Sequence, residues 1–272
     1  MEKYNKVVDL KNFKPKNTSP NESELRVQLA AAYRIFNYLK WDYLIYGHIT
    51  VRVPGPEKHF LINPFGLRYD EVTASNLVKI DINGKIVEPS DYPVNPAGFI
   101  IHSAIHAARE DAHCVMHTHT VAGMAAAALK DPIKNIDFSG MMFTNRIAFH
   151  DFEGVTVREE ECERLANNLN NKDVMILRNH GLLSVGSTIA HAFIRMHNLE
   201  RACEVQLKTR AIDDKIIDVS DNIAKAHADE IENSDNGNLA FQALTRLMDK
   251  ICLLYTSPSP RDLSTSRMPS SA

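Results

Sequence analysis

Val115-Met-His-Thr-His119 is the stretch of sequence from which both a fold and a site can be predicted. A strand turns successive side chains to opposite faces, so His117 and His119 would point the same way, about 6.6 Å apart along the strand. Two such imidazoles can converge on one metal ion. A third can come from His180, because an Asn-His-Gly turn presents its side chain at a strand end. Three histidines leave coordination positions open, as in catalytic zinc sites. A lone His-x-His pair can instead serve only packing, so the wider sequence decides.

The segments around this strand alternate between helical and strand periods. Apolar residues recur every three or four positions from Glu22 to Phe36 and from Ile189 to Leu207, which predicts two amphipathic helices. Pro96 suits the first turn of a third helix. Alternation, short apolar runs and an Asn83-Gly84 turn predict strands at 49–53, 59–63, 78–82, 85–87, 114–120 and 174–177. We therefore predict a single α/β domain whose central mixed, largely antiparallel sheet is flanked by helices.

The two ends of the chain differ in composition from the rest. Residues 1–20 are polar and charged and end in turn-forming residues, so we expect a flexible arm before a domain at 21–250. Residues 253–272 change abruptly to serine, proline and arginine without periodicity. They resemble translated adapter sequence from automated assembly, which predicts a non-native or disordered tail that carries no chemistry.

The composition narrows the classes of partner. The 272 residues are 44% hydrophobic, enough for a sizeable core, and 31 basic against 34 acidic residues give a net charge of −3. This balance favours neither a nucleic-acid nor a membrane partner. Four separated cysteines form no CxxC pair, and the amino-terminal residues do not form a signal peptide. We therefore expect a soluble protein, most simply a cytoplasmic one.

Five segments together resemble the class II aldolase/adducin family, and they stand closer to its adducin-like branch than to the sugar-phosphate aldolases. Between about Glu22 and Arg210 they occur in the family order: Gly47–Val53, His59–Leu67, Asn95–His106, Val115–Thr120 and Leu177–Gly186. The resemblance implies that His117, His119 and His180 bind a divalent metal, zinc by preference, although other transition metals would suit histidines. In the family's aldolases this metal stabilises an enediolate formed by C–C bond cleavage.

This sequence departs from the family pattern where an acid/base glutamate is expected. That position holds Gly98, nineteen residues before the His-x-His motif. His102 lies one helical turn further along, so it could supply a base or a fourth ligand; alternatively it packs the helix against the sheet. The resemblance also places a tyrosine from a neighbouring subunit near residues 149–152, where His150 could donate a proton.

The family's phosphate-binding positions have also changed. Where sugar-phosphate aldolases have Asn, Thr-Gly and Ser-Ser, this sequence has His48, Phe65-Gly66 and Pro96-Ala97. The changes remove hydroxyl donors, so we expect a substrate without phosphate. Asn63, Gly66 and Gly98 are candidates for lining its pocket.

Two functions follow from the resemblance. We favour a zinc-dependent, aldolase-like lyase that acts on a small, non-phosphorylated hydroxy-carbonyl compound. The alternative is a non-catalytic module like the adducin head domain, which would serve oligomerisation or assembly with actin and spectrin. Either reading implies a homo-oligomer, usually a tetramer. The sequence leaves the substrate, the reaction direction and the group that replaces the glutamate open.

Overall fold

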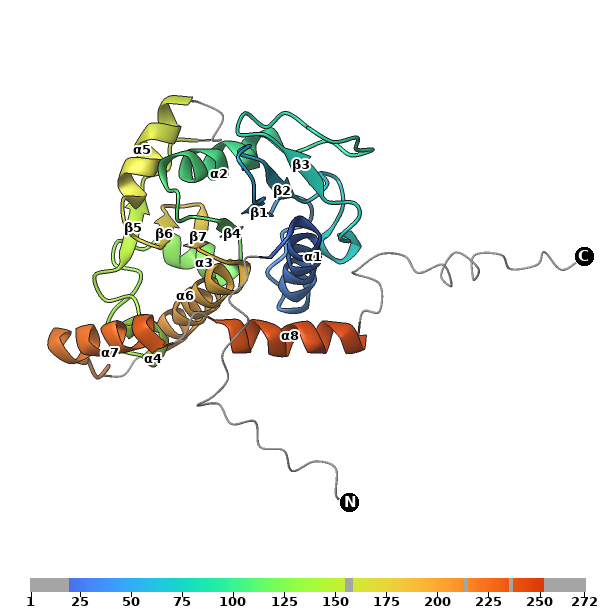
Figure 1. Ribbon diagram of the computed structural model, residues 1–272. Helices are drawn as coiled ribbons and strands as arrows, with labels where there is room; N and C mark the ends of the chain where they lie inside the picture. Colours follow the sequence, from blue (N-terminus) through green and yellow to red (C-terminus); the bar gives the residue numbers. More distant parts are fainter. Residues whose placement is uncertain (1–19, 155–158, 213–214, 235–236, 252–272) are drawn as a thin grey trace, which may run out of the picture.

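The computed structural model describes residues 20–154, 159–212, 215–234 and 237–251. Their centre is a seven-stranded sheet in the order β3-β2-β1-β4-β7-β6-β5 (Figure 1). Every neighbouring pair is antiparallel except β5 with β6, which confirms a mixed, largely antiparallel sheet. The strands are β1 His48–Arg52, β2 Phe60–Ile62, β3 Val78–Ile80, β4 Cys114–Thr118, β5 Ile147–His150, β6 Val174–Leu177 and β7 Gly181–Gly186.

Helices cover both faces of the sheet. On one face lie α2 (Pro96–Ala108) and α5 (Glu159–Leu169); on the other lie α1 (Glu22–Tyr38), α3 (Val121–Ala127), α6 (Ile189–Arg210) and α8 (Asn238–Ile251) (Figure 1). The chain also forms η1 (Tyr69–Glu71), α4 (Phe138–Met141) and α7 (Asp221–Ser234). No helix among the described residues is long and apolar enough to cross a bilayer.

Strand alternation divides β1 between two cores. Ile49 and Val51 pack into the large core beneath α1 and α6. Thr50, one residue out of phase, points to the opposite face and meets α2. His48 has the same parity as Thr50, which places it on the α2 side of the sheet, opposite His117 of β4.

Local sequence explains where several elements begin and end. Asn21 and Glu24 form a capping box that starts α1, and α2 begins at Pro96 as predicted. The predicted strand at 78–82 ends at Ile80, because the Asp81 carboxylate accepts hydrogen bonds from two backbone N–H groups of the following turn. The predicted strand at 85–87 is reduced to one bridge, between Ile80 and Ile86. The predicted tail at 253–272, and the predicted arm at 1–20 apart from Pro20, lie outside the described residues.

Candidate metal centre

His117 lies in β4 with one ring nitrogen committed to the neighbouring strand. Its Nδ1 is 2.7 Å from the carbonyl oxygen of Leu182, and its side chain is buried. A carbonyl oxygen only accepts, so Nδ1 carries the hydrogen and donates it. In the neutral imidazole, Nε2 therefore holds the free lone pair, as a metal ligand requires.

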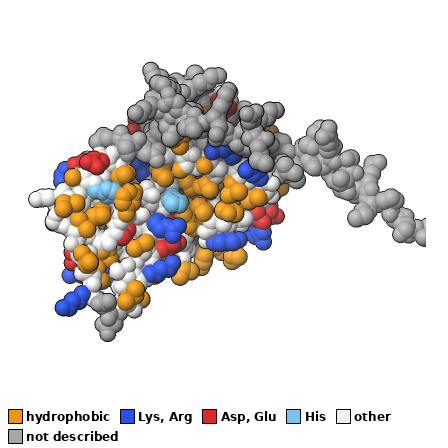
Figure 2. Space-filling view, turned by 90° about the horizontal axis from the view of Figure 1, so that it is seen from below, with side chains coloured by type: hydrophobic (Ala, Val, Ile, Leu, Met, Phe, Trp, Pro, Cys, Tyr) orange, Lys and Arg blue, Asp and Glu red, His pale blue; other side chains and the backbone are white. Residues whose placement is uncertain are grey.

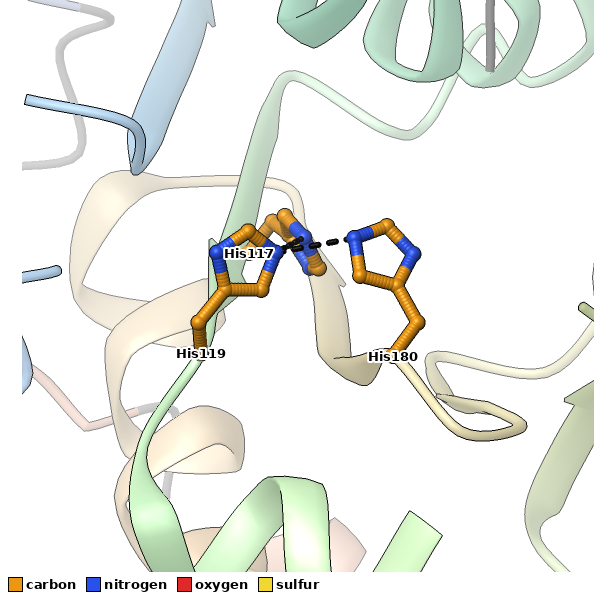
Figure 3. A group of neighbouring side chains, drawn as sticks. All are labelled: His117, His119 and His180. Atoms are coloured by element: carbon orange, nitrogen blue, oxygen red, sulfur yellow. Dashed lines mark hydrogen bonds between the residues drawn. The ribbon is translucent and has the colours of Figure 1, made fainter. Parts of the chain in front are cut away.

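The three predicted histidines come together around that lone pair. The Nε2 atoms of His117 and His119 are 2.7 Å apart, and those of His119 and His180 are 2.8 Å apart. One ligand nitrogen from each residue lies within 4.8 Å of the others, and the rings face a common point (Figure 3). Two ligands of a tetrahedral zinc ion stand about 3.3 Å apart, so shifts of a few tenths of an ångström would admit an ion.

The strand prediction around His119 needs one correction. β4 ends at Thr118, so His119 does not lie on the strand as its i+2 residue. The chain turns here because α3 begins at Val121, with the Thr120 hydroxyl accepting the N–H of Gly123 as its cap. The imidazole of His119 still reaches His117, from the loop beyond the strand.

His180 lies in a tight turn, and the surroundings of that turn explain why Asn179 and Gly181 flank it. Asn179 adopts a left-handed conformation with φ +57°, which asparagine tolerates better than most residues. A Cβ atom at Gly181 would overlap the carbonyl oxygen of Thr118, so only glycine lets β7 start this close to β4. The turn therefore delivers His180 to the end of β4.

Burial keeps these imidazoles neutral. Desolvation lowers the pKa of His117 well below its ordinary value and that of His119 to about 4, and neighbouring histidines add to both effects. Burial also lowers the pKa of His180, partly opposed by Glu161. Neutral imidazoles are the form that binds metal. The donor set thus fits a divalent transition metal, with three ligands from one end of the sheet.

A buried carboxylate fixes the end of β4 from behind. Glu200 of α6 accepts hydrogen bonds from the hydroxyls of Thr118, at 2.5 Å, and Thr120, at 2.6 Å. Burial raises the pKa of Glu200 to about 7, against the lowering effect of both hydroxyls. The two threonines flank His119, so Glu200 positions the ligand-bearing loop. Sequence pattern alone did not single out Glu200, although it follows the buried Met196 by one helical turn.

His102 and His150 occupy different surroundings from those of the three histidines. His102 is fully buried on α2, and its Nδ1 lies 2.7 Å from the Thr50 hydroxyl. The ring of His48 contacts both His102 and His117. No described contact joins His102 to the three histidines directly. The role of His102 as a base or fourth ligand stays a prediction.

His150 ends β5 and lines a narrow pocket that His180 also lines. Its Nδ1 is 2.9 Å from the Asn168 amide nitrogen, and its Nε2 is 3.5 Å from Glu161. The amide N–H donates, so Nδ1 accepts. His150 is therefore near the candidate metal centre, and its role as a proton donor stays a prediction.

The predicted pocket residues are spread out. The Asn63 side chain hydrogen-bonds to the hydroxyl of Tyr33, a residue of the large core. Gly66 has φ +103° and open space around its Cα. Gly98 alone among these candidates lies beside the histidines, because a Cβ there would meet the His48 ring at 2.7 Å. His48, interpreted from the sequence only as a changed phosphate position, thus stands beside His117.

Known proteins share this fold and this arrangement of segments. The Class II Aldolase and Adducin N-terminal domain family matches residues 27–207. Alpha-adducin from Rattus norvegicus is 47% identical over 208 residues, which are 75% of this chain and 28% of that protein.

Two solved structures superpose over most of this chain. An aldolase II superfamily protein from Pseudomonas syringae is 43% identical, with a TM-score of 0.83 over 88% of this chain and 97% of that one. L-fuculose 1-phosphate aldolase from Glaciozyma antarctica PI12 is 31% identical, with a TM-score of 0.78 over 90% of this chain and 97% of that one.

Proposed function

The chain belongs to the class II aldolase and adducin family, and from this premise we propose that it is a divalent-metal-dependent lyase. Its substrate would be a small hydroxy-carbonyl compound without phosphate. The observation that carries the proposal is the convergence of three neutral imidazoles on one point. The Nε2 atoms are also at hydrogen-bond distance from one another, so without an ion a neutral ring can donate to its neighbour, and a bound ion would replace those bonds.

His117, His119 and His180 would hold the ion, with zinc preferred and manganese, cobalt, nickel or iron also suited to imidazole ligands. When bound, a divalent ion acts as a Lewis acid that polarises a carbonyl group. The chain's own contribution is orientation. Leu182 fixes the tautomer of His117, and Glu200 fixes the threonines on either side of His119. Such hydrogen bonds behind the ligands hold a metal site in its working geometry.

The absence of phosphate from the substrate rests on three changed positions. His48, Phe65 and Pro96-Ala97 stand where the resemblance implies phosphate-binding side chains. One relative is named L-fuculose 1-phosphate aldolase, so L-fuculose 1-phosphate is the phosphorylated compound to compare with its phosphate-free form. We expect cleavage of L-fuculose to exceed cleavage of L-fuculose 1-phosphate if either is a substrate, and parallel assays of the two would test this.

The metal is tested by elemental analysis of purified full-length protein after zinc reconstitution. We expect about one equivalent in the wild type and none in the His117→Ala, His119→Ala double variant. His113→Ala, which removes an exposed histidine close by in sequence, is the matched control and should retain the metal. A folded wild type without metal would remove the basis for the lyase.

A second function is favoured by the 47% identity to alpha-adducin. The chain would then be a non-catalytic head-like module that assembles with itself, or with actin and spectrin. The match covers only 28% of that adducin, so those partners are a proposal here. Cosedimentation with filamentous actin, with and without spectrin, would separate the two functions. Binding without metal uptake would favour the module.

Self-association is part of both proposals. Exposed apolar side chains occur on α4, α7, α8 and the segment before α7, namely Phe138, Ile217, Ile223 and Leu239. Figure 2, which views the molecule from the side of α7 and α8, shows hydrophobic side chains gathered there among charged ones. Such a surface suits contact with another copy of the chain. Light scattering should give a tetramer, and we propose residues 21–250 as the assembling domain in the cytoplasm.

A further inference from the structure

A chain of hydrogen bonds runs behind the candidate metal centre, and its starting point fixes every hydrogen in it. The Nδ1 atom of His106 lies 2.8 Å from the carbonyl oxygen of Ala112. The carbonyl can only accept, so Nδ1 carries a hydrogen. Burial lowers the pKa of His106 to about 3, which leaves the ring neutral and its Nε2 a bare acceptor. The Thr50 hydroxyl, 2.8 Å away, must therefore donate to Nε2.

The same reasoning sets the next histidine. Thr50 has a single hydroxyl hydrogen, and it is used on His106, so its oxygen accepts from the Nδ1 of His102 at 2.7 Å. His102 is fully buried, and desolvation lowers its pKa well below the ordinary value, so it is neutral too. Its Nε2 is consequently a lone-pair acceptor. That nitrogen has no hydrogen-bond partner among the described residues.

His48 stands between this acceptor and the three histidines. Its ring centroid is 4.3 Å from that of His102 and 5.5 Å from that of His117. It is 3% exposed, and neither of its ring nitrogens makes a hydrogen bond of standard geometry in the described structure, although backbone groups of Tyr46 and Gly98 lie near enough to oppose the lowering of its pKa by burial. Gly98 leaves the space for the ring, since a side chain there would collide with it. Buried polar atoms without partners destabilise a fold, so such atoms beside a site indicate that a ligand completes them.

The hydrogen-bonding capacity of these unpartnered atoms indicates which groups a ligand would need. His102 offers one lone pair, and a neutral His48 offers one lone pair and one N–H group. The excess of acceptors calls for a ligand that brings hydrogen-bond donors. A hydroxyl group brings one hydrogen for one of these lone pairs, and its oxygen can accept the N–H group of His48. A phosphate dianion brings only acceptors and would leave both lone pairs unsatisfied.

We propose that His48 is a substrate-positioning residue that receives a hydroxyl group of the substrate beside the metal centre, with the lone pair of His102 available to a second donor of the same substrate. This inference rests on the proposed lyase function and names the part of the substrate that the α2 side of the sheet recognises. Thr50 and His106 serve by holding His102 in its acceptor tautomer.

The test compares His48→Leu, which keeps the side-chain volume without nitrogen, with His48→Gln, which keeps a donor and an acceptor. Binding of dihydroxyacetone and of dihydroxyacetone phosphate is measured by calorimetry on zinc-loaded protein of determined metal content. We expect dihydroxyacetone to bind the wild type more tightly than its phosphate does. His48→Leu should weaken binding roughly tenfold at unchanged metal content, and His48→Gln should restore part of it. Undiminished binding by His48→Leu, or tighter binding of the phosphate, would overturn the inference.

A second measurement does not depend on metal. In metal-free protein, His48→Leu should raise the melting temperature, because it removes two buried nitrogens that lack partners. A lower melting temperature would show that His48 serves the fold and would overturn the inference. If the wild type takes up no zinc, the lyase proposal fails, and the melting experiment still shows whether the His48 ring is without partners in the fold.

Discussion

On the α6 side of the sheet the buried carboxylate of Glu200 is satisfied by two threonine hydroxyls, and the Tyr33 hydroxyl by Ile49 and Asn63. On the α2 side, His48 and His102 are equally buried and keep three ring nitrogens without partners. Near the large core beneath α1 and α6, the exceptions are the Tyr69 hydroxyl and one ring nitrogen of His197, which have no hydrogen-bond partner among the described residues. The α6 side of the sheet therefore supports the fold, whereas the α2 side is where we propose that a ligand binds. Buried polar groups that stabilise a protein are bonded within it, and groups that bind are left incomplete.

The largest effect should come from removing the hydrogen-bonded carboxylate of Glu200. Glu200→Ala leaves a cavity and removes the carboxylate acceptor of the buried Thr118 hydroxyl and the half-buried Thr120 hydroxyl, so we expect a loss of about 3–4 kcal/mol in the free energy of unfolding. Glu204→Ala, which removes a half-buried carboxylate paired with Arg201 one turn away, should cost under about 1 kcal/mol. Chemical denaturation of metal-free protein measures both. Equal losses would show that Glu200 does not anchor β4.

The hydrogen-bond chain on the other face is broken by Thr50→Val. This nearly isosteric change leaves the Nδ1 of His102 and the Nε2 of His106 without partners, and we expect a loss of about 2–3 kcal/mol. Thr245→Val is the control, because that hydroxyl donates only to the Phe241 carbonyl of its own helix. A cost for Thr50→Val no larger than the control's would mean that the two histidines are not tied through Thr50.

Acid should destabilise the α2 side in a defined direction. An unfolded His106 takes a proton near pH 6.5, whereas the buried residue resists protonation until about pH 3. Its contribution is therefore fully present above pH 6.5 and is lost as the pH falls through that window, by about 2 kcal/mol at pH 5. The stability difference between wild type and His106→Gln, followed from pH 7 to 5 in a chelating buffer, isolates this group. If the stability difference did not change with pH, His106 would not be buried as a neutral ring.

The sequence could predict the sheet, its flanking helices and the grouping of His117, His119 and His180 for identifiable reasons. Alternation and amphipathic periodicity are local, and the His-x-His and Asn-His-Gly motifs each lie within a few residues. The position of His48 beside His117 could not be predicted, because it depends on Gly98, fifty positions away, which leaves room for its ring. The sequence did indicate that His48 and Thr50, two residues apart on one strand, face the same side of the sheet. Glu200 was missed because helical spacing alone did not show which acidic residue of α6 faces the core.

The candidate metal centre is tested most directly by the metal content of the full-length protein after zinc reconstitution, measured beside its His117→Ala, His119→Ala variant. We expect about one zinc per chain in the wild type and none in the variant, with both folded by circular dichroism. Wild-type protein that stays metal-free, or a variant that retains its zinc, would contradict a metal centre at the end of β4.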